Sequence, residues 1–391
     1  MPNFTTRKVK VLSLPFKKDD IEILQIAKGR MLDLVLVKVG DEEFFLTIKP
    51  TKDSFLIKGE KITRPSKVGL LQKALELFSV EFCEEILSSA FGYNKNSLIE
   101  NNSIIKSEKE LLEIINGNKK SKICIEIGFG SGRHILYRAK ENKDTIFIGI
   151  EIYKPAIEQV AKLALKEELN NIYLIDNDAR IFLNLIDSNK IEKIYLHFPI
   201  PWNDAPHRRV ISEEFLMDVQ RVLKKDGSFE LRSDSREYVD FSILKFLDRN
   251  GVEVEIFKNK DLEISSKYED RWKKQQKDIY DIFVKNKVES LSLKNEYNMD
   301  FDTYSPKKII NSFENITKKF DDFFIHIEDM YKFNDNDIVI KFSFGGFNTP
   351  ENGFIRISKN SAEYFIKKPL MTKRNYKAHC ELREILAKWN K

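Results

Sequence analysis

Residues 122–132 read KICIEIGFGSG, an apolar run followed by glycines at every second position. The run has the length and composition of a buried β-strand. Gly128, Gly130 and Gly132 permit a tight turn and let the backbone approach a ligand without a Cβ atom in the way. The next segment has helical spacing, so its first N–H groups face the same place. This stretch therefore predicts a strand, a turn and a helix with a ligand site at the end of the strand.

The same alternation of short apolar runs and longer helical segments continues to about residue 286. The later runs are TIFIGIEI, NIYLID, KIYLHF, SFELRSD and VEVEIF, with helical segments between them. This alternation predicts an α/β fold with a mostly parallel, doubly wound sheet that carries helices on both faces. Ligands of such sheets collect at the carboxyl ends of the strands. The functional residues are therefore expected where strands end.

The segments on either side of this region have other patterns. Residues 1–95 contain several short strand-like runs and the helical stretch KVGLLQKALELF, and they predict a β-rich N-terminal domain of unknown role. Residues 287–391 contain the runs DIVIKFSF and GFIRIS and a final helical stretch, and they predict a small α+β C-terminal domain. The stretch 92–109 is rich in Asn, Ser and Lys and is interpreted as a domain edge. The central domain is placed at residues 110–286.

Composition limits the class of protein. The chain has 391 residues, 66 Lys+Arg, 61 Asp+Glu and a net charge of +5, which permits a nucleic-acid partner without requiring one. Three scattered cysteines do not form a disulfide framework or a zinc cluster. The sequence has no leader pattern and no apolar run that could span a bilayer. We expect a cytoplasmic protein without a metal; its oligomeric state is not readable from the sequence, and a monomer is the default expectation.

Acidic residues stand at the ends of the first three strands of the central domain. Glu126 precedes the glycines, Glu151 ends the second strand, and Asp178 follows the third. A dinucleotide fingerprint would need a glycine at position 133, where the sequence has Arg133. The spacing G-x-G-x-G after an acid instead resembles motif I of the Rossmann-like, class I methyltransferases that depend on S-adenosylmethionine.

This resemblance implies a cofactor role for each strand end. Glu126 would suit the ammonium and sulfonium charges of S-adenosylmethionine, and Glu151 would accept from the ribose hydroxyls. Asp178 would accept from the adenine amino group, while the backbone at Ala179 fixes the edge of the ring. The alternatives are a purely structural glycine turn, a helix N-terminal charge at Glu151 and a helix cap at Asp178.

The fourth strand runs into residues 195–210, YLHFPIPWNDAPHRRV. This stretch resembles the F-P-D-P-W signature of the bacterial tRNA (guanine-N7-)-methyltransferase family. Two later segments, at residues 233–238 and 266–271, resemble the family's T-D-W-E-x-Y and T-K-[FY]-E-x-R segments. The resemblance covers about residues 120–285, whereas the outer domains lie outside the common family core. It implies methyl transfer to N7 of a tRNA guanine, guanosine 46 of the variable loop.

The resemblance also implies a set of substrate residues. His207, Arg208 and Arg209 suit phosphate contacts, or they belong to a solvated loop. Trp202 stacks on a base or anchors its loop in the core. Glu269 accepts from N1 and N2 of guanine or forms a surface ion pair with a lysine. The implied residues are Pro201, Trp202, His207, Arg208, Arg209, Asp234, Ser266, Lys267, Tyr268 and Glu269.

Two positions depart from the family pattern. Ile200 replaces the aspartate between the prolines, and Asp204 replaces a lysine. Because N7 methylation makes the purine positive, a nearby carboxylate would lower the barrier, and Asp234 is the candidate for this catalytic role. The alternative is that Asp234 caps the following helix.

Other functions remain open at this stage. The chain could methylate another acceptor, or it could be an RNA-binding module without catalysis. Basic stretches in the outer domains, ITRPSK and KKPLMTKRNYK, suggest that these domains extend the contact with RNA.

Overall fold

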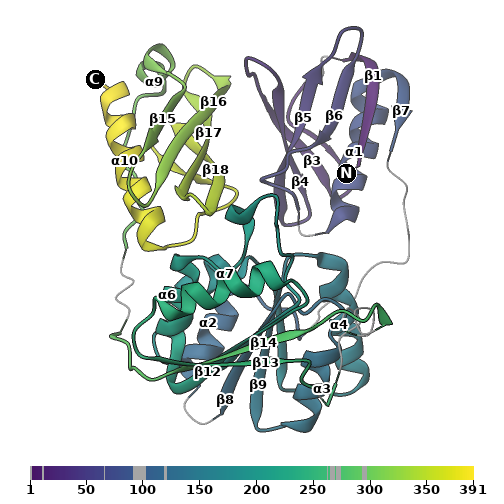
Figure 1. Cartoon of the computed structure of the whole chain (residues 1–391). Helices are drawn as coiled ribbons and strands as arrows, with labels where there is room; N and C mark the ends of the chain where they lie inside the picture. Colours follow the sequence, from purple (N-terminus) through teal and green to yellow (C-terminus); the bar gives the residue numbers. More distant parts are fainter. Residues whose placement is uncertain are drawn as a thin grey trace. The chain divides into compact units, whose positions relative to one another are not determined.

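A computed structural model describes residues 2–10, 13–65, 67–90, 103–118, 121–261, 263–264, 269, 274–292 and 297–391. They form two compact units (Figure 1). The central unit is Ile99–Lys294, and the terminal unit combines Met1–Leu98 with Asn295–Lys391. Much of the expected domain edge at residues 92–109 lies outside the described residues.

The central unit contains a seven-stranded sheet in the order β10-β9-β8-β11-β12-β14-β13. All pairs from β10 to β12 are parallel, while β14 is antiparallel to both of its neighbours. The predicted mostly parallel sheet is confirmed, and β14 is an additional strand that the sequence analysis did not separate. The strands are β8 (Lys122–Ile127), β9 (Thr145–Glu151), β10 (Ile172–Asp176), β11 (Ile191–His197), β12 (Leu223–Ser233), β13 (Val252–Lys258) and β14 (Tyr280–Asn286).

Helices connect these strands as the alternation predicts. The helices are α2 (Glu108–Gly117), α3 (Arg133–Glu141), α4 (Lys154–Lys166), α5 (Ala179–Leu185), α6 (Glu213–Val222) and α7 (Arg236–Leu247), with a 3₁₀ turn η1 (Pro206–Arg208). Serine side chains begin three of them: Ser107 caps α2, Ser212 caps α6 and Ser235 caps α7. Helix α6 ends at Val222, and β12 follows it directly from Leu223.

The two faces of this sheet differ in character. On one face, α2, α5, α6 and α7 bury an apolar core that includes Ile125, Phe229 and Leu231. On the other face, α3 and α4 pack over β8, β9 and β10 around Phe147. Polar side chains from β8, β11, β12 and β14 share this second face, which we call the polar face. Its carboxyl edge carries the candidate site.

The terminal unit contains two antiparallel sheets. One has the order β2-β3-β4-β5-β6-β1-β7, packed on α1 (Val68–Phe82), and the other has the order β15-β16-β17-β18-β19, packed on α10 (Lys373–Trp389). The first sheet contains β1 (Asn3–Val9), β2 (Phe16–Lys18), β3 (Ile21–Ala27), β4 (Asp33–Val39), β5 (Glu42–Pro50), β6 (Phe55–Gly59) and β7 (Cys83–Ser89). The second contains β15 (Ile316–Lys319), β16 (Phe324–Asn334), β17 (Asp337–Gly346), β18 (Thr349–Ser358) and β19 (Ala362–Phe365), with α9 (Pro306–Ser312) beside α10.

The two ends of the chain meet within this terminal unit. Lys28 and Lys332 exchange two backbone hydrogen bonds of 2.8 Å. Around them, side chains from both sheets form one buried apolar cluster, which includes Phe45 and Phe354 with ring centroids 5.2 Å apart. The sequence analysis treated the two ends as separate domains, whereas their contacts join them in one unit. The boundaries at residues 95, 110 and 286 stay predictions.

Candidate functional site at the carboxyl edge of the sheet

The glycine turn after β8 has the backbone that its sequence requires. Gly128, Gly130 and Gly132 have φ values of 69°, 51° and 75°, in the left-handed region that favours glycine. A Cβ atom on Gly132 would lie 2.4 Å from Val160 Cγ2, so this glycine allows α3 and α4 to pack closely. A Cβ on Gly128 would meet no protein atom within 4 Å, so a ligand can approach the backbone there.

Glu151 links this turn to the end of β9. Its Oε2 accepts from the Gly130 N–H at 3.2 Å, and its Oε1 accepts from the N–H groups of Ile152 and Tyr153 at 2.9 and 3.1 Å. A carboxylate offers about four acceptor positions, of which these bonds occupy three. Glu151 therefore shapes the glycine turn and keeps capacity for about one further donor, such as a hydroxyl.

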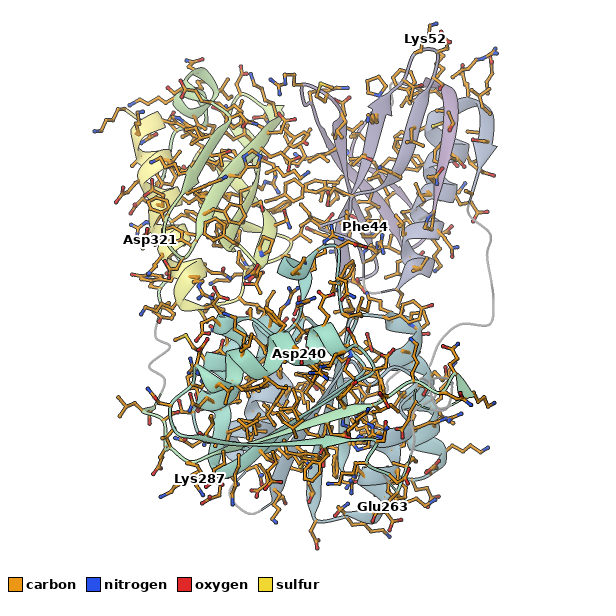
Figure 2. The ribbon with its side chains drawn as sticks, in the orientation of Figure 1. Phe44, Lys52, Asp240, Glu263, Lys287 and Asp321 are labelled. Carbon is orange, nitrogen blue, oxygen red and sulfur yellow. The ribbon has the colours of Figure 1, made fainter. Side chains whose placement is uncertain are left out.

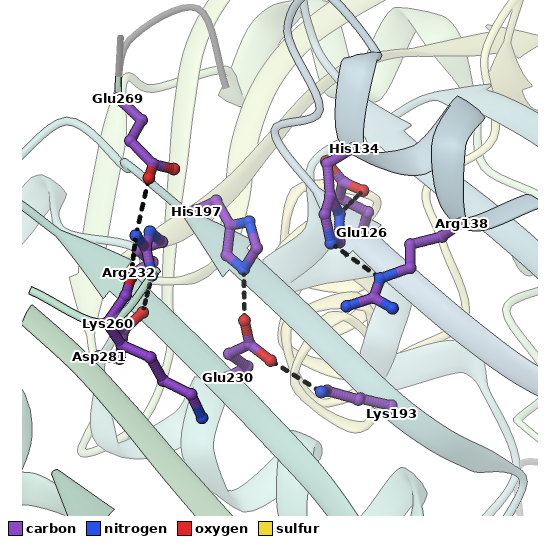
Figure 3. Close-up of polar contacts among 10 residues, drawn as sticks. All are labelled: Glu126, His134, Arg138, Lys193, His197, Glu230, Arg232, Lys260, Glu269 and Asp281. Atoms are coloured by element: carbon purple, nitrogen blue, oxygen red, sulfur yellow. Dashed lines mark hydrogen bonds and ion pairs between the residues drawn. The ribbon is translucent and has the colours of Figure 1, made fainter. Parts of the chain in front are cut away.

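Glu126 is buried beside a histidine that the sequence analysis did not single out. Its Oε2 lies 2.7 Å from Nδ1 of His134, in the first turn of α3. The Nε2 atom of His134 lies 3.4 Å from Nε of Arg138, which can only donate. His134 therefore accepts from Arg138 and donates to Glu126, which fixes the direction in which this carboxylate faces (Figure 3).

Asp178 adopts the helix-capping alternative. It is the N-cap of α5, and its Oδ1 accepts from the Arg180 N–H at 2.9 Å. The same carboxylate pairs with the Arg180 guanidinium, and this hydrogen bond raises the pKa of Arg180. An adenine amino group would have to share Asp178 with Arg180. The N–H of Ala179 is a first-turn donor that no helical carbonyl satisfies.

Backbone strain marks the end of β11. Phe198 and Trp202 have φ values of 51° and 45°, a conformation that bulky residues rarely adopt. They flank the proline-rich segment, whose middle residue Ile200 is 63% exposed. The Phe198 N–H still donates to the Arg232 carbonyl at 2.7 Å, so the strained segment begins where β11 leaves β12. Such strain concentrates at functional sites.

Trp202 and Arg208 face each other in the loop after β11. The Arg208 guanidinium carbon lies 5.1 Å from the centroid of the Trp202 ring, a cation–π distance. Trp202 is only half-buried and Arg208 is exposed. This burial leaves both interpretations of Trp202, base stacking and anchoring of the loop, as predictions. The side chain of His207 lies outside the described part of the structure.

Arg209 is 4% exposed and braces the loop from inside. Its Nε donates to the Pro201 carbonyl at 2.8 Å, and its Nη2 donates to Glu237 Oε1 at 2.6 Å. The guanidinium also lies 4.7 Å from the ring centroid of Phe241. A phosphate contact at Arg209 would need these bonds to break, so this geometry gives Arg209 a positioning role.

Asp234 follows the last residue of β12 and is not a helix cap. The cap of α7 is Ser235, whose side chain accepts from the Tyr238 N–H at 3.3 Å, so the capping alternative for Asp234 is wrong. The largely buried Asp234 carboxylate accepts from Lys277 Nζ at 3.0 Å. The backbone hydrogen bond from Phe198 to Arg232 aligns the ends of β11 and β12. Asp234, two residues after Arg232, therefore lies at the same edge of the sheet as the strained loop.

Glu269 is buried in an ion-pair cluster of the polar face. Its Oε1 accepts from Arg232 Nη2 at 2.9 Å, while Arg232 Nη1 donates to Asp281 Oδ1 at 2.5 Å (Figure 3). Burial raises the pKa of Asp281 against the opposing effect of Arg232. The surface-pair alternative is wrong for Glu269, since its carboxylate is inside the protein. Ser266, Lys267 and Tyr268 lie outside the described residues.

A second polar cluster joins β11 to β12. Glu230 accepts from His197 Nε2 at 3.0 Å and pairs with Lys193 Nζ at 2.7 Å. Burial would raise the pKa of Glu230, but the hydrogen bonds and charges of His197 and Lys193 lower it below its usual range. The ring centroids of His197 and His134 lie 4.7 Å apart, so the cluster reaches Glu126 (Figure 3). The sequence analysis did not predict this network. Polar residues at every second position in KIYLHF and SFELRSD could have indicated it, because alternate residues of a strand lie on the same face.

Comparison with known proteins assigns the family. Residues 120–282 match a family model described as a putative methyltransferase. The tRNA (guanine-N(7)-)-methyltransferase of Campylobacter jejuni strain 81-176 is 48% identical over 99% of this chain and 98% of its own length. The chain belongs to the tRNA (guanine-N(7)-)-methyltransferase family. Proteins of the same name from Campylobacter fetus and Helicobacter hepaticus are 42% and 35% identical, each over 99% of this chain.

These relatives also align with the outer segments. Coverage of 99% of this chain means that the alignment includes the N- and C-terminal segments as well as the central unit. Among solved structures, the 30S ribosomal A1408 methyltransferase from an uncultured bacterium aligns with 49% of this chain and 97% of its own chain, at 20% identity and a TM-score of 0.34. At that score the likeness supports no further conclusion.

No three His, Cys, Asp or Glu side chains gather in the described part of the chain in a way that could hold a metal ion. No helix among the described residues is long and apolar enough to cross a membrane.

Proposed function

We propose that this protein transfers the methyl group of S-adenosylmethionine to N7 of a guanine in tRNA, at guanosine 46 of the variable loop, and so makes 7-methylguanosine. The observation that carries the proposal is the meeting of two features at neighbouring strand ends. The glycine turn with Glu151 ends β8 and β9, and the strained proline-rich segment ends β11, which pairs with β8. The choice of N7 of a tRNA guanine as methyl acceptor rests on the family to which the chain belongs.

The residues at the carboxyl edge fit the proposed cofactor. The open position beside Gly128 and the remaining acceptor capacity of Glu151 suit a ribose. Glu126 would receive the methionine ammonium, with His134 holding the carboxylate in place. The Ala179 N–H would bind the adenine edge, and Asp178 would contribute chiefly through the cap that positions this N–H. S-adenosylmethionine supplies an electrophilic methyl group on a positive sulfur atom.

The transfer itself asks little acid–base chemistry of the protein. The N7 lone pair of guanine forms the new N–C bond while the C–S bond breaks and its electron pair stays on sulfur. No proton has to leave N7, so no general base is required. The chain must align the three atoms and exclude water. The stiff backbone between Phe198 and Trp202 suits this task, because little ordering is needed on binding.

A negative charge at the same edge of the sheet would stabilise the positive charge that methylation creates on the purine. Methylation puts a positive charge on the purine, and a fixed carboxylate stabilises that charge in the transition state. Ile200 cannot supply it, so Asp234 takes this role in our proposal. Its ion pair with Lys277 would have to loosen or leave one oxygen facing the base. Trp202 and Arg208 would form a stacked platform for an unpaired nucleotide.

Nucleoside analysis tests this proposal. Purified protein is incubated with S-adenosylmethionine and tRNA that lacks 7-methylguanosine, and the digested product is separated and identified by mass spectrometry. The expected product is 7-methylguanosine, located at position 46 by cleavage mapping. A different methylated nucleoside would support the proposed cofactor site but would show that the methyl acceptor is not N7 of guanine. No methylation despite bound S-adenosylmethionine would reject tRNA guanine as the acceptor.

A further inference from the structure

The C-terminal sheet carries a cluster of cations at the start of α10. Lys373 and Arg374 open this helix, and Lys377 follows one turn later. Exposed Lys367 and Lys368 stand in the loop just before it. The first turn of α10 contains no acidic residue. Because a helix N-terminus is itself partly positive, cations there oppose the helix dipole. Helix stability therefore does not explain this cluster.

Two exposed aromatic side chains lie in neighbouring turns. Phe347, between β17 and β18, is 49% exposed, and its ring centroid lies 5.8 Å from that of Phe324. Phe320, between β15 and β16, is 37% exposed and stacks on Phe323 at 4.3 Å. Each exposed ring is thus held by a second ring beneath it and presents an apolar surface to solvent.

Side-chain contacts join both turns to the start of α10. A Cβ atom on Gly346 would lie 3.2 Å from Arg374 Cδ, so Arg374 packs against the residue beside Phe347. Lys377 Nζ donates to Asp322 Oδ2 at 2.9 Å, in the turn that contains Phe320. These elements form one surface, which we call the α10 patch and define by Phe320, Phe347, Lys368, Lys373 and Arg374.

The α10 patch keeps a positive charge after its ion pairs are counted. Asp322 binds Lys377 and lies 3.9 Å from Arg374, and exposed Asp321 stands beside it in the same turn (Figure 2). Among the residues that the structure describes, Lys368 and Lys373 of the patch take part in no ion pair, and neither does Lys367 beside them. Their charges therefore remain available to an anionic partner. Exposed rings beside such charges match the two components of single-stranded nucleic acid, bases and phosphates.

We propose that the α10 patch binds the tRNA substrate, with phosphates at Lys368, Lys373 and Arg374 and an unpaired base stacked on Phe347. This inference rests on the proposed function, because it takes the polyanion to be the tRNA that the central unit methylates. Phosphate contacts of this kind add affinity without reading sequence. An acidic protein surface would satisfy the lysines but would leave the exposed rings without a partner.

The test compares two charge-matched variants of the full chain. The test variant is Lys368→Glu with Lys373→Glu. The control is Lys307→Glu with Lys359→Glu, which makes the same charge change at exposed sites elsewhere in the same sheet-and-helix region. Lys307 lies in α9. Its chain neighbours Ser305 and Lys308 donate hydrogen bonds to Asn390, so this control site lies near the opposite end of α10. Glutamate at position 373 also suits the helix N-terminus, so the test variant should stay folded, as a thermal melt will verify.

Affinity for unmodified tRNA is measured by fluorescence anisotropy over a range of KCl concentrations. Losing two phosphate contacts should reduce the slope of log Kd against log salt by about 1.4 to 1.8. The control should keep the wild-type slope. Phe347→Ala should weaken binding roughly tenfold with an unchanged slope, since stacking does not release counterions.

Two results would overturn the α10 patch. One is a test variant with wild-type affinity and slope, and the other is an equal loss in test and control variants, which would mean a diffuse charge effect. The same samples are assayed for 7-methylguanosine. Product formation with unchanged binding would reject the patch alone, whereas patch-dependent binding without any methylated guanine would reject the proposed function alone.

Discussion

A single strand, β12, separates two kinds of side chain on the two faces of the central sheet. Phe229 and Leu231 point into an apolar core under four helices. Glu230 and Arg232 alternate with them and point to the polar face. There Glu230 pairs with His197, and Arg232 pairs with Asp281. Apolar packing depends on volume and tolerates exchange of similar side chains, whereas a buried charge depends on its partners. Within β12, the side chains of the polar face therefore link stability to the geometry of the candidate site, whereas those of the apolar face act through packing volume.

Arg232→Met should have the largest effect, because it leaves two buried carboxylates without their common cation. We expect a loss of about 3–5 kcal/mol in the free energy of unfolding of the central unit. Hydrogen exchange of the β12 amides measures this unit separately from the terminal unit.

The control for Arg232→Met is the same substitution together with Asp281→Leu and Glu269→Gln, which removes the orphaned charges and should recover much of the loss. A loss below about 1 kcal/mol for Arg232→Met alone would contradict the interpretation of Arg232 as the centre of the cluster.

Asp234→Asn tests whether the polar face ends in a catalytic carboxylate. We expect kcat to fall about 100-fold, because a fixed charge that faces the developing purine cation is lost. Affinity for S-adenosylmethionine should not change, and single-turnover methyl transfer with saturating tRNA measures the chemical step. An unchanged rate would mean that alignment of the reacting atoms is sufficient.

Glu230→Gln should change how stability depends on pH. The folded-state pKa of Glu230 lies below its ordinary value of 4.5, so the carboxylate stabilises the fold fully above about pH 4.5. This contribution is lost as pH falls through the lower folded-state value. We expect the variant to be about 2 kcal/mol less stable than the wild type at pH 7.

The difference between Glu230→Gln and the wild type should shrink in acid. Denaturation curves at pH 7 and at about pH 3 check this. An equal difference at both pH values would mean that Glu230 acts through its shape and not through its charge.

Leu231→Met should have the smallest effect, about 1 kcal/mol or less, because it nearly conserves volume in the apolar core. Methyl-transfer rates and S-adenosylmethionine affinity should match the wild type. A large loss of activity from this substitution would remove the distinction between the two faces of β12.

Local features of the site could be predicted from the sequence. The glycine turn, Glu151 and the cap at Asp178 depend on residues close to one strand end, and each has the geometry that its residue type favours. The mostly parallel sheet also follows from the spacing of its apolar runs.

Features that depend on distant partners could not be predicted in the same way. Arg209 can be buried because it donates a hydrogen bond to Glu237, 28 residues later in the chain. Glu269 can be buried because it accepts one from Arg232, 37 residues earlier. From sequence alone both residues look like surface charges available to RNA. The joining of the two chain ends around Phe45 and Phe354 likewise arises from a contact across most of the chain.

The most direct test of the account is methyl transfer to two otherwise identical tRNA transcripts, one with guanosine and one with 7-deazaguanosine, which has carbon in place of N7. Labelled S-adenosylmethionine reports the transfer, and an anisotropy titration verifies that both transcripts bind. We predict methylation of the guanosine transcript and none of the 7-deaza transcript. Equal labelling of both would place the methyl group on another atom and contradict the proposed reaction.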